Sequence, residues 1–114
     1  MNASTAPDND IQAGQVVRAS DLAPYQTGAV VSRTIIKESR GTVTLFSFDK
    51  GQELSEHTTP FNALVYVLEG EAEVTIAGVS RPVQGGDMLI MPAGKPHALK
   101  ASERFKMMLV MIRE

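Results

Sequence analysis

The sequence contains two histidines, His57 and His97, and these are its strongest candidates for chemistry. A histidine changes charge near neutral pH and its neutral ring binds metal ions, so it can serve as an acid, a base or a ligand. The chain has no cysteine, which excludes disulfides, thiolate nucleophiles and cysteine-ligated zinc. Any reactive centre therefore has to be built from histidine, carboxylate and hydroxyl groups.

Glycine and proline residues stand at fixed distances from both histidines. The pattern is Gly51, His57 and Gly70 in the first half, and Gly86, Pro92, Gly94 and His97 in the second. Such residues suit tight turns between strands, because glycine adopts a positive φ and proline has a fixed φ. In this spacing the sequence resembles the two signature motifs of the cupin superfamily, over residues 30–112. It is therefore identified as a small single-domain cupin of the conserved-barrel type.

The departures from the family pattern bear on metal binding. The resemblance implies a metal site of three His and one Glu, but Thr59 and Ala63 occupy two of those four positions. His57 and His97 remain as the candidate metal ligands, whereas open catalytic sites normally have three protein ligands. We therefore expect no tightly bound metal. The alternative is a divalent ion of Zn, Mn, Fe, Ni or Cu, held weakly by the two histidines.

The residues that would surround the histidines allow two interpretations. In a cupin barrel, His57 and His97 would meet as an acid/base pair or an anion clamp. Thr59 would offer a hydroxyl group to a ligand, while Ala63 and Val65 would give the pocket an apolar wall. In the structural interpretation, the histidines are hydrogen-bonded lining residues, Thr59 reflects β-propensity, and Ala63 and Val65 are ordinary core. The sequence leaves both interpretations open.

Three functions are compatible with this pattern. We expect a cupin-domain protein that binds a small organic ligand in its barrel, through a pocket at His57 and His97. The alternative is a cupin enzyme of the isomerase, epimerase, decarboxylase or dioxygenase type, which uses the two histidines as weak metal ligands or as an acid/base pair. A third function is a scaffold or sensor domain that dimerises, as the resemblance to the cupin part of some transcription regulators implies.

The elements that would position these residues are short strands. Residues 29–37 are rich in β-branched side chains. Along residues 41–49, Val43, Leu45 and Ser47 fall on one face of a strand and Thr44, Phe46 and Phe48 on the other, and residues 71–76 alternate between polar and apolar. No stretch has the pattern of an amphipathic helix of several turns. Many short strands with Gly and Pro turns predict an all-β sandwich or small barrel. The resemblance specifies a cupin jelly-roll barrel, in which two antiparallel sheets form a double-stranded β-helix.

The length and composition predict one domain. The chain has 114 residues, of which 43% are apolar, enough for a core of its own. Residues 1–15 are small and polar, and we expect them to form a flexible N-terminal arm. Residues 16–114 would then form a single cupin β-barrel domain.

Charge and hydropathy limit the partners and the location. The formal net charge is -2 and the basic residues are dispersed, which argues against nucleic acid or an anionic membrane as the main partner. No apolar stretch is long enough to span a bilayer, and the N-terminus lacks the features of a secretory signal. We therefore expect a cytoplasmic protein.

The last predicted strand indicates a further partner. Residues 105–113, FKMMLVMIR, are apolar on both faces of a strand. A strand of this kind lies between the barrel core and a second covering layer. We expect a homodimer, because obligate interfaces resemble a divided core. The alternative is that the arm or another segment of the same chain covers it.

Overall fold

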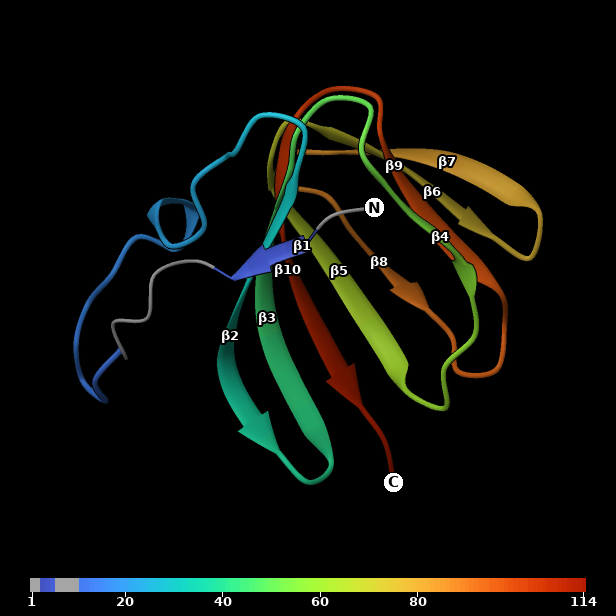
Figure 1. The fold of residues 1–114 in the computed structure, drawn as a ribbon. Helices are drawn as coiled ribbons and strands as arrows, with labels where there is room; N and C mark the ends of the chain where they lie inside the picture. Colours follow the sequence, from blue (N-terminus) through green and yellow to red (C-terminus); the bar gives the residue numbers. More distant parts are fainter. Residues whose placement is uncertain (1–2, 6–10) are drawn as a thin grey trace.

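The computed structural model describes residues 3–5 and 11–114, which form strands and one short 3-10 helix, η1 (Ala19–Asp21) (Figure 1). The strands are β1 (Ala3–Thr5), β2 (Val30–Glu38), β3 (Gly41–Phe48), β4 (Glu53–His57), β5 (Asn62–Glu69), β6 (Glu71–Ile76), β7 (Val79–Gln84), β8 (Met88–Met91), β9 (His97–Ala101) and β10 (Phe105–Ile112). The described part of the chain contains no α-helix. The all-β prediction is confirmed.

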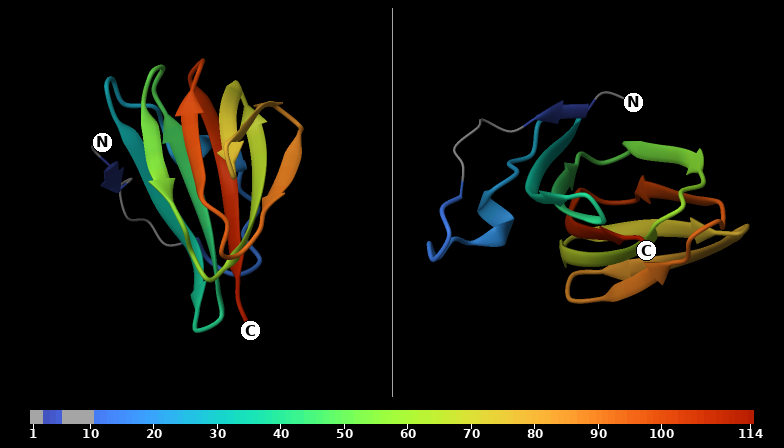
Figure 2. Two further views of the ribbon diagram at one scale, coloured as in Figure 1. Left: turned by 90° about the vertical axis from the view of Figure 1, so that its right-hand side faces the viewer. Right: turned by 90° about the horizontal axis from the view of Figure 1, so that it is seen from below.

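The strands form two sheets that face each other (Figure 2). The six-stranded sheet has the order β1-β2-β3-β10-β5-β8, and the four-stranded sheet has the order β4-β9-β6-β7. Neighbouring strands are antiparallel, apart from the parallel pair of β1 and β2. Because strands distant in sequence are neighbours in both sheets, the chain crosses repeatedly between them, as in a jelly roll. The predicted jelly-roll architecture of two sheets is confirmed.

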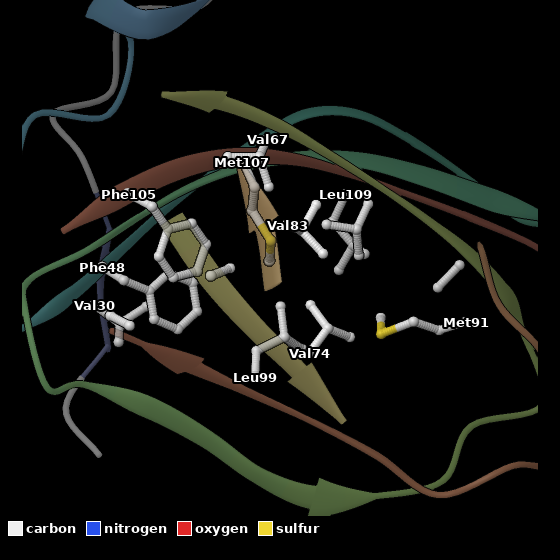
Figure 3. Close-up of a cluster of buried hydrophobic side chains, with 14 residues drawn as sticks. Val30, Phe48, Val67, Val74, Val83, Met91, Leu99, Phe105, Met107 and Leu109 are labelled. Atoms are coloured by element: carbon white, nitrogen blue, oxygen red, sulfur yellow. The ribbon is translucent and has the colours of Figure 1, made fainter. Parts of the chain in front are cut away.

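Inward-facing side chains of both sheets form the main core (Figure 3). They alternate with outward-facing residues along each strand, as the sequence pattern predicts for β3 and β6. Phe48 and Phe105 stack with their ring centroids 4.5 Å apart. Both rings and Val30 are fully buried. We name the end of the barrel that these three residues fill the Phe end.

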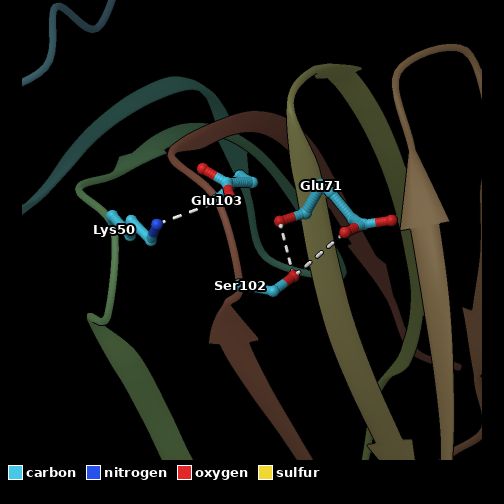
Figure 4. A network of polar contacts seen from close by, with 4 residues as sticks. All are labelled: Lys50, Glu71, Ser102 and Glu103. Atoms are coloured by element: carbon cyan, nitrogen blue, oxygen red, sulfur yellow. Dashed lines mark hydrogen bonds and ion pairs between the residues drawn. The ribbon is translucent and has the colours of Figure 1, made fainter.

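Polar contacts join the turns at the Phe end (Figure 4). Lys50 Nζ lies 3.5 Å from Glu103 Oε1. The Ser102 hydroxyl group donates to the backbone oxygen and to Oε2 of Glu71, both at 3.4 Å. Since Lys50, Ser102 and Glu103 are exposed and Glu71 is only half-buried, each contact contributes little free energy by itself. Their position adds a polar outer layer to the end that the aromatic pair fills.

A segment before β2 covers part of the outer face of the six-stranded sheet. Ala23 packs with Val31 and Leu45 in a second buried cluster, and Met108 of β10 packs against it. The alternative in which the same chain covers the last strand is therefore correct for Met108. Ile112, at the other end of β10, remains 59% exposed. The chain itself therefore supplies a second layer over Met108 but not over Ile112.

Tyr25 fastens this segment to the barrel. Its hydroxyl group donates to Glu69 Oε2 at 2.9 Å, and the Arg104 guanidinium carbon lies 3.7 Å from the centre of its ring. Burial and the bond to Glu69 raise the pKa of Tyr25 above its usual range. The phenol therefore remains a donor at neutral pH, and the contact holds two distant parts of the chain together.

The predicted N-terminal arm lies partly outside the described residues. Within residues 1–15, the structure describes β1, which pairs in parallel with the start of β2, and residues 11–15. Residues 1–2 and 6–10 lie outside the described part of the chain. Among the described residues, none belongs to a helix with the length and hydropathy of a membrane span.

Candidate functional site

The two histidines meet at the end of the barrel opposite the Phe end. His57 is the last residue of β4 and His97 is the first residue of β9, and they are paired in the register of the four-stranded sheet. Their ring centroids lie 4.4 Å apart, with an angle of 69° between the rings. The fold therefore joins the two halves of the sequence pattern at one place, which we name the His end.

His57 and the apolar run that follows it lie in different strands. His57 is the last residue of β4, whereas the apolar strand β5 begins at Asn62. Pro60 lies between them and has no backbone N–H for strand pairing, so a loop separates the two strands. The apolar run and the histidine belong to different sheets.

Each imidazole ring is oriented by a carbonyl group two residues before it. His57 Nδ1 lies 2.8 Å from the Ser55 backbone oxygen, and His97 Nδ1 lies 3.3 Å from the Lys95 backbone oxygen. A carbonyl oxygen can only accept, so both Nδ1 atoms carry the hydrogen. When the rings are neutral, both Nε2 atoms therefore have a free lone pair. This tautomer suits binding of a donor group or an ion at Nε2.

The two rings differ in their exposure to water. His97 is buried, with 3% of its surface exposed, whereas His57 is exposed. Burial lowers the pKa of His97, the charge of His57 lowers it further, and the bond to Lys95 acts in the opposite direction. His97 is consequently neutral at pH 7. The site combines a buried neutral imidazole with a more accessible one.

Two loops tied to each other border the histidine pair. The Gly94 backbone N–H donates to the Thr59 carbonyl oxygen at 2.9 Å, and the Ala93 N–H donates to Asn62 Oδ1 at 3.0 Å. These bonds join residues 58–61 and the first residue of β5, Asn62, to residues 92–96, so that they connect the loops next to His57 and His97. The sequence interpretation missed Asn62. An Asn just after a proline-containing turn is a local signal for such a cap, but its partner is distant in sequence.

Thr59 has a local role that was not predicted. Its Oγ1 accepts a hydrogen bond from the Phe61 backbone N–H at 3.2 Å, which closes a turn within the loop. The side chain is half-buried. The hydroxyl hydrogen remains available as a donor, so this turn leaves the proposed contact with a ligand open.

Ala63 and Val65 face inward from β5, as expected if strand alternation resumes after Pro60. Both are fully buried in the main core. Ala63 is paired with Met91 across the strands, and Ile76 is paired with His97. The inner surface next to the histidines is therefore apolar. Met91 and Ile76 belong to this surface in the same way as Ala63, which only the registers reveal.

The described residues do not fit the four-ligand metal site that the family pattern implies. Among residues 3–5 and 11–114, no group of three or more His, Cys, Asp or Glu side chains could hold a metal ion. The two histidines supply two nitrogen donors, one fewer than the usual protein contribution to an open site.

Comparison with protein families gives a match over most of the barrel. Residues 44–113 match the family model described as the cupin domain. This range contains both histidines and every strand from β4 to β10. None of the proteins with curated descriptions matches the sequence.

Three solved structures resemble the chain over most of its length. A conserved protein of unknown function from Streptococcus pyogenes is 38% identical, with a TM-score of 0.88 and 93% of each chain covered. A cupin superfamily protein from Desulfitobacterium hafniense is 27% identical, with a TM-score of 0.86, covering 96% of this chain and all of that one. A cupin 2 conserved barrel domain protein from Leptotrichia buccalis is 35% identical, with a TM-score of 0.80. This match covers 82% of this chain and 46% of that one.

Proposed function

The chain belongs to the cupin family, and from this premise we propose that it binds a small organic molecule at the His end of its barrel. His57 and His97 are the residues that would contact the ligand. The observation that carries the proposal is the orientation of the two rings. Each Nδ1 donates to a carbonyl group of its own chain, and so each Nε2 keeps a lone pair for a ligand.

The state of His97 defines the chemical class of the ligand. A buried neutral imidazole accepts a hydrogen bond at Nε2 and offers no positive charge to an anion. The ligand therefore has to donate an O–H or N–H group to His97, as an alcohol, a phenol or an enol does. A carboxylate lacks such a donor and would leave Nε2 without a partner, which is costly for a buried group.

The side chains around the rings favour a ligand with an apolar part. Ile76 is next to His97 in the sheet, and Ala63 and Met91 face inward at the same end of the barrel. Apolar walls with a few polar groups are typical of sites for small organic molecules. Thr59 stands in the bordering loop and can donate its hydroxyl hydrogen to a carbonyl or ether oxygen.

Thermal unfolding with pairs of related compounds tests this proposal. Each pair consists of a small alcohol or phenol and the carboxylate of the same carbon skeleton. We expect the hydroxyl member of at least one pair to raise the unfolding temperature, since a ligand at 100 times its Kd adds about 2.7 kcal/mol. The carboxylate member should have no effect.

Variants of the site and of a distant surface complete the test. His97→Asn should abolish the stabilisation by the ligand, and His57→Asn should weaken it. Thr75→Val is the matched control, because Thr75 lies on the outer face of the same sheet, where it contacts Ser80. The proposal is wrong if stabilisation by the hydroxyl compound survives His97→Asn, or if only carboxylates stabilise the protein.

A second candidate function is acid/base catalysis by the same pair. The observation that favours it is the contact of a buried neutral His97 with an exposed His57, which places a base beside a group that can exchange protons with water. Incubation of a stabilising ligand in deuterated buffer tests this function. Exchange of a carbon-bound hydrogen that His97→Asn abolishes would support it, and binding without exchange would contradict it.

A further inference from the structure

Arg113 follows β10, which ends at the His end of the barrel (Figure 1). The inward-facing residues of β10 belong to the main core or pack against it; they are Phe105, Met107, Leu109 and Met111. Sheet pairing continues past β10, because the Arg113 backbone N–H donates to the Arg40 carbonyl oxygen at 2.9 Å. Strand alternation therefore places Arg113 on the same inner side as Met111, at the edge of the barrel interior.

The guanidinium group of Arg113 extends toward the loop that follows His57. Its carbon atom Cζ lies 5.4 Å from the centre of the Phe61 ring, which is a cation–π contact, and Nη2 donates to the Ser39 carbonyl oxygen at 3.5 Å. Phe61 belongs to the loop between β4 and β5, and hydrogen bonds tie this loop to the one before His97. Arg113 therefore contacts one of the two connected loops that border the histidine pair.

The positive charge of Arg113 has no carboxylate partner in the described part of the chain. Two ion pairs are present among residues 3–5 and 11–114, and neither includes Arg113. The residue is exposed, and the bond to Ser39 occupies one of the five N–H groups of its guanidinium. The remaining N–H groups can bind a carboxylate in the bidentate geometry that arginine favours.

The charges of the strand connections also favour an anion at the His end. The connections at this end contain Arg40 and Lys95 and no acidic residue; they are residues 39–40, 58–61, 77–78 and 92–96. The connections at the Phe end contain three acidic and two basic residues; they are residues 49–52, 70, 85–87 and 102–104. Because charges near a site attract ligands of the opposite sign, an anionic ligand is favoured at the His end over the Phe end.

We propose that Arg113 binds a carboxylate group of the ligand, so that the ligand of the His end is a hydroxy acid. This inference rests on the proposed function, in which a hydroxyl group donates to Nε2 of His97. The two groups of the ligand have different partners. The carboxylate therefore adds affinity to a hydroxyl compound but does not replace the donor that the buried ring needs.

The places of the two partners define the skeleton between these groups. His97 belongs to the four-stranded sheet, whereas Arg113 follows a strand of the six-stranded sheet and extends toward Phe61, next to β5 of the same sheet. Facing sheets lie about 10 Å apart. An aromatic ring or a short chain between the hydroxyl and carboxylate groups spans this distance beside the apolar wall of Ala63 and Met91, whereas a single carbon atom does not.

Isothermal titration calorimetry with acids and their methyl esters tests this inference. The acids are para-hydroxyphenylacetate and para-hydroxyphenylpropanoate, since each methyl ester keeps the phenol and the skeleton but removes the charge. We expect at least one acid to bind the wild-type protein about 5-fold more tightly than its ester, which is the effect of a good ion pair at an exposed site. Added salt should reduce this preference for the acid, because it screens an exposed charge.

Three substitutions separate the role of Arg113 from a general effect of charge. Arg113→Gln should bind acid and ester equally, while its affinity for the ester stays that of the wild-type protein. Arg113→Lys keeps the charge but not the planar fork, so it should retain part of the preference for the acid. Arg18→Gln is the matched control and should keep the full preference, because Arg18 precedes η1, which contacts Lys106 near the Phe end.

The outcomes distinguish this inference from the proposed function. Acids that bind no better than their esters overturn the role of Arg113, and so does a preference for the acid that Arg113→Gln leaves unchanged. In either case, ester binding that His97→Asn abolishes still supports the proposed function. If neither the acids nor the esters bind, both the role of Arg113 and the proposed function are wrong for this class of ligand. The far-UV circular dichroism spectrum of each variant shows whether the fold is retained.

Discussion

The Phe end and the His end of the barrel are built from the same two sheets but are filled differently. At the Phe end, two stacked aromatic rings are fully buried. At the His end, two imidazole rings touch, one of them exposed, beside alanine and thioether side chains. The packing of rigid rings favours stability, whereas titratable rings with free nitrogen atoms favour binding. The comparison indicates that the Phe end contributes more to the stability of the fold, whereas the His end contacts the ligand in the proposed function.

The largest effect is expected from removing an aromatic ring at the Phe end. Phe105→Ala should lower the free energy of unfolding by about 3–5 kcal/mol, because it removes a buried ring and leaves a cavity beside Phe48. His57→Ala, which removes an exposed ring at the opposite end, should cost much less. Urea unfolding of both variants measures the difference. Equal losses of unfolding free energy in the two variants would contradict the larger contribution of the Phe end to stability.

A pair of glycines sharpens the same comparison. Both Gly70 and Gly78 have a positive φ, at 82° and 83°. A Cβ atom at Gly70, at the Phe end, would lie 2.0 Å from the Arg104 backbone oxygen, whereas nothing lies within 4 Å at Gly78, in the turn at the His end. Gly70→Ala should therefore cost about 2–5 kcal/mol, and Gly78→Ala only about 1 kcal/mol. Thermal unfolding of the two variants checks this order. A larger loss of stability in Gly78→Ala than in Gly70→Ala would contradict it.

The pH dependence of stability is expected to come from the His end. Burial and the charge of His57 depress the pKa of His97 in the folded state. The unfolded chain then binds a proton more readily, so stability is full above the pKa of an unfolded histidine, about 6.5, and decreases as the pH falls below it. Urea unfolding between neutral and mildly acidic pH should show this decrease.

His97→Asn isolates the contribution of this ring to the pH profile. The variant should have a flatter profile between neutral and mildly acidic pH, whatever its stability at neutral pH. Phe105→Ala should keep the slope of the wild-type protein while lowering the whole curve. A slope unchanged by His97→Asn would show that other groups cause the pH dependence.

The sequence was sufficient to predict the general fold but not the details of the His end. The alternation of apolar and polar residues along residues 71–76 agrees with the inward face of β6, because strand periodicity is local. Residues 41–49 did not indicate an inward face, because β3 has apolar residues on both faces. β4 gave no such signal, since Glu53–His57 has one apolar residue among polar ones and is largely exposed. The tie between Asn62 and Ala93 depends on two loops meeting, which tertiary packing decides.

The outer face of the six-stranded sheet shows the same limit on a larger scale. The registers place Ile36, Val43, Val110, Leu64 and Ile90 side by side on this face. The sequence indicated an unusual outer face only for β10, and this line of side chains appears only when the registers of five strands are known together. A shift of one residue in any strand would turn its side chain to the other face. Because the packed core and the turn lengths fix these registers, an apolar surface spread over distant strands is hard to predict from the sequence.

The smallest effect is expected from chelating agents, and it tests the donor count at the His end. Two histidine nitrogens are fewer donors than divalent ions normally find in a protein site, so any bound metal should contribute little to stability. Incubation of untagged protein with an excess of EDTA should leave the unfolding temperature and the pH profile unchanged. A decrease of several degrees that added Zn²⁺ or Mn²⁺ restores would contradict this expectation. In that case the ion would stabilise the His end, and the contrast with the Phe end would be smaller than the side chains indicate.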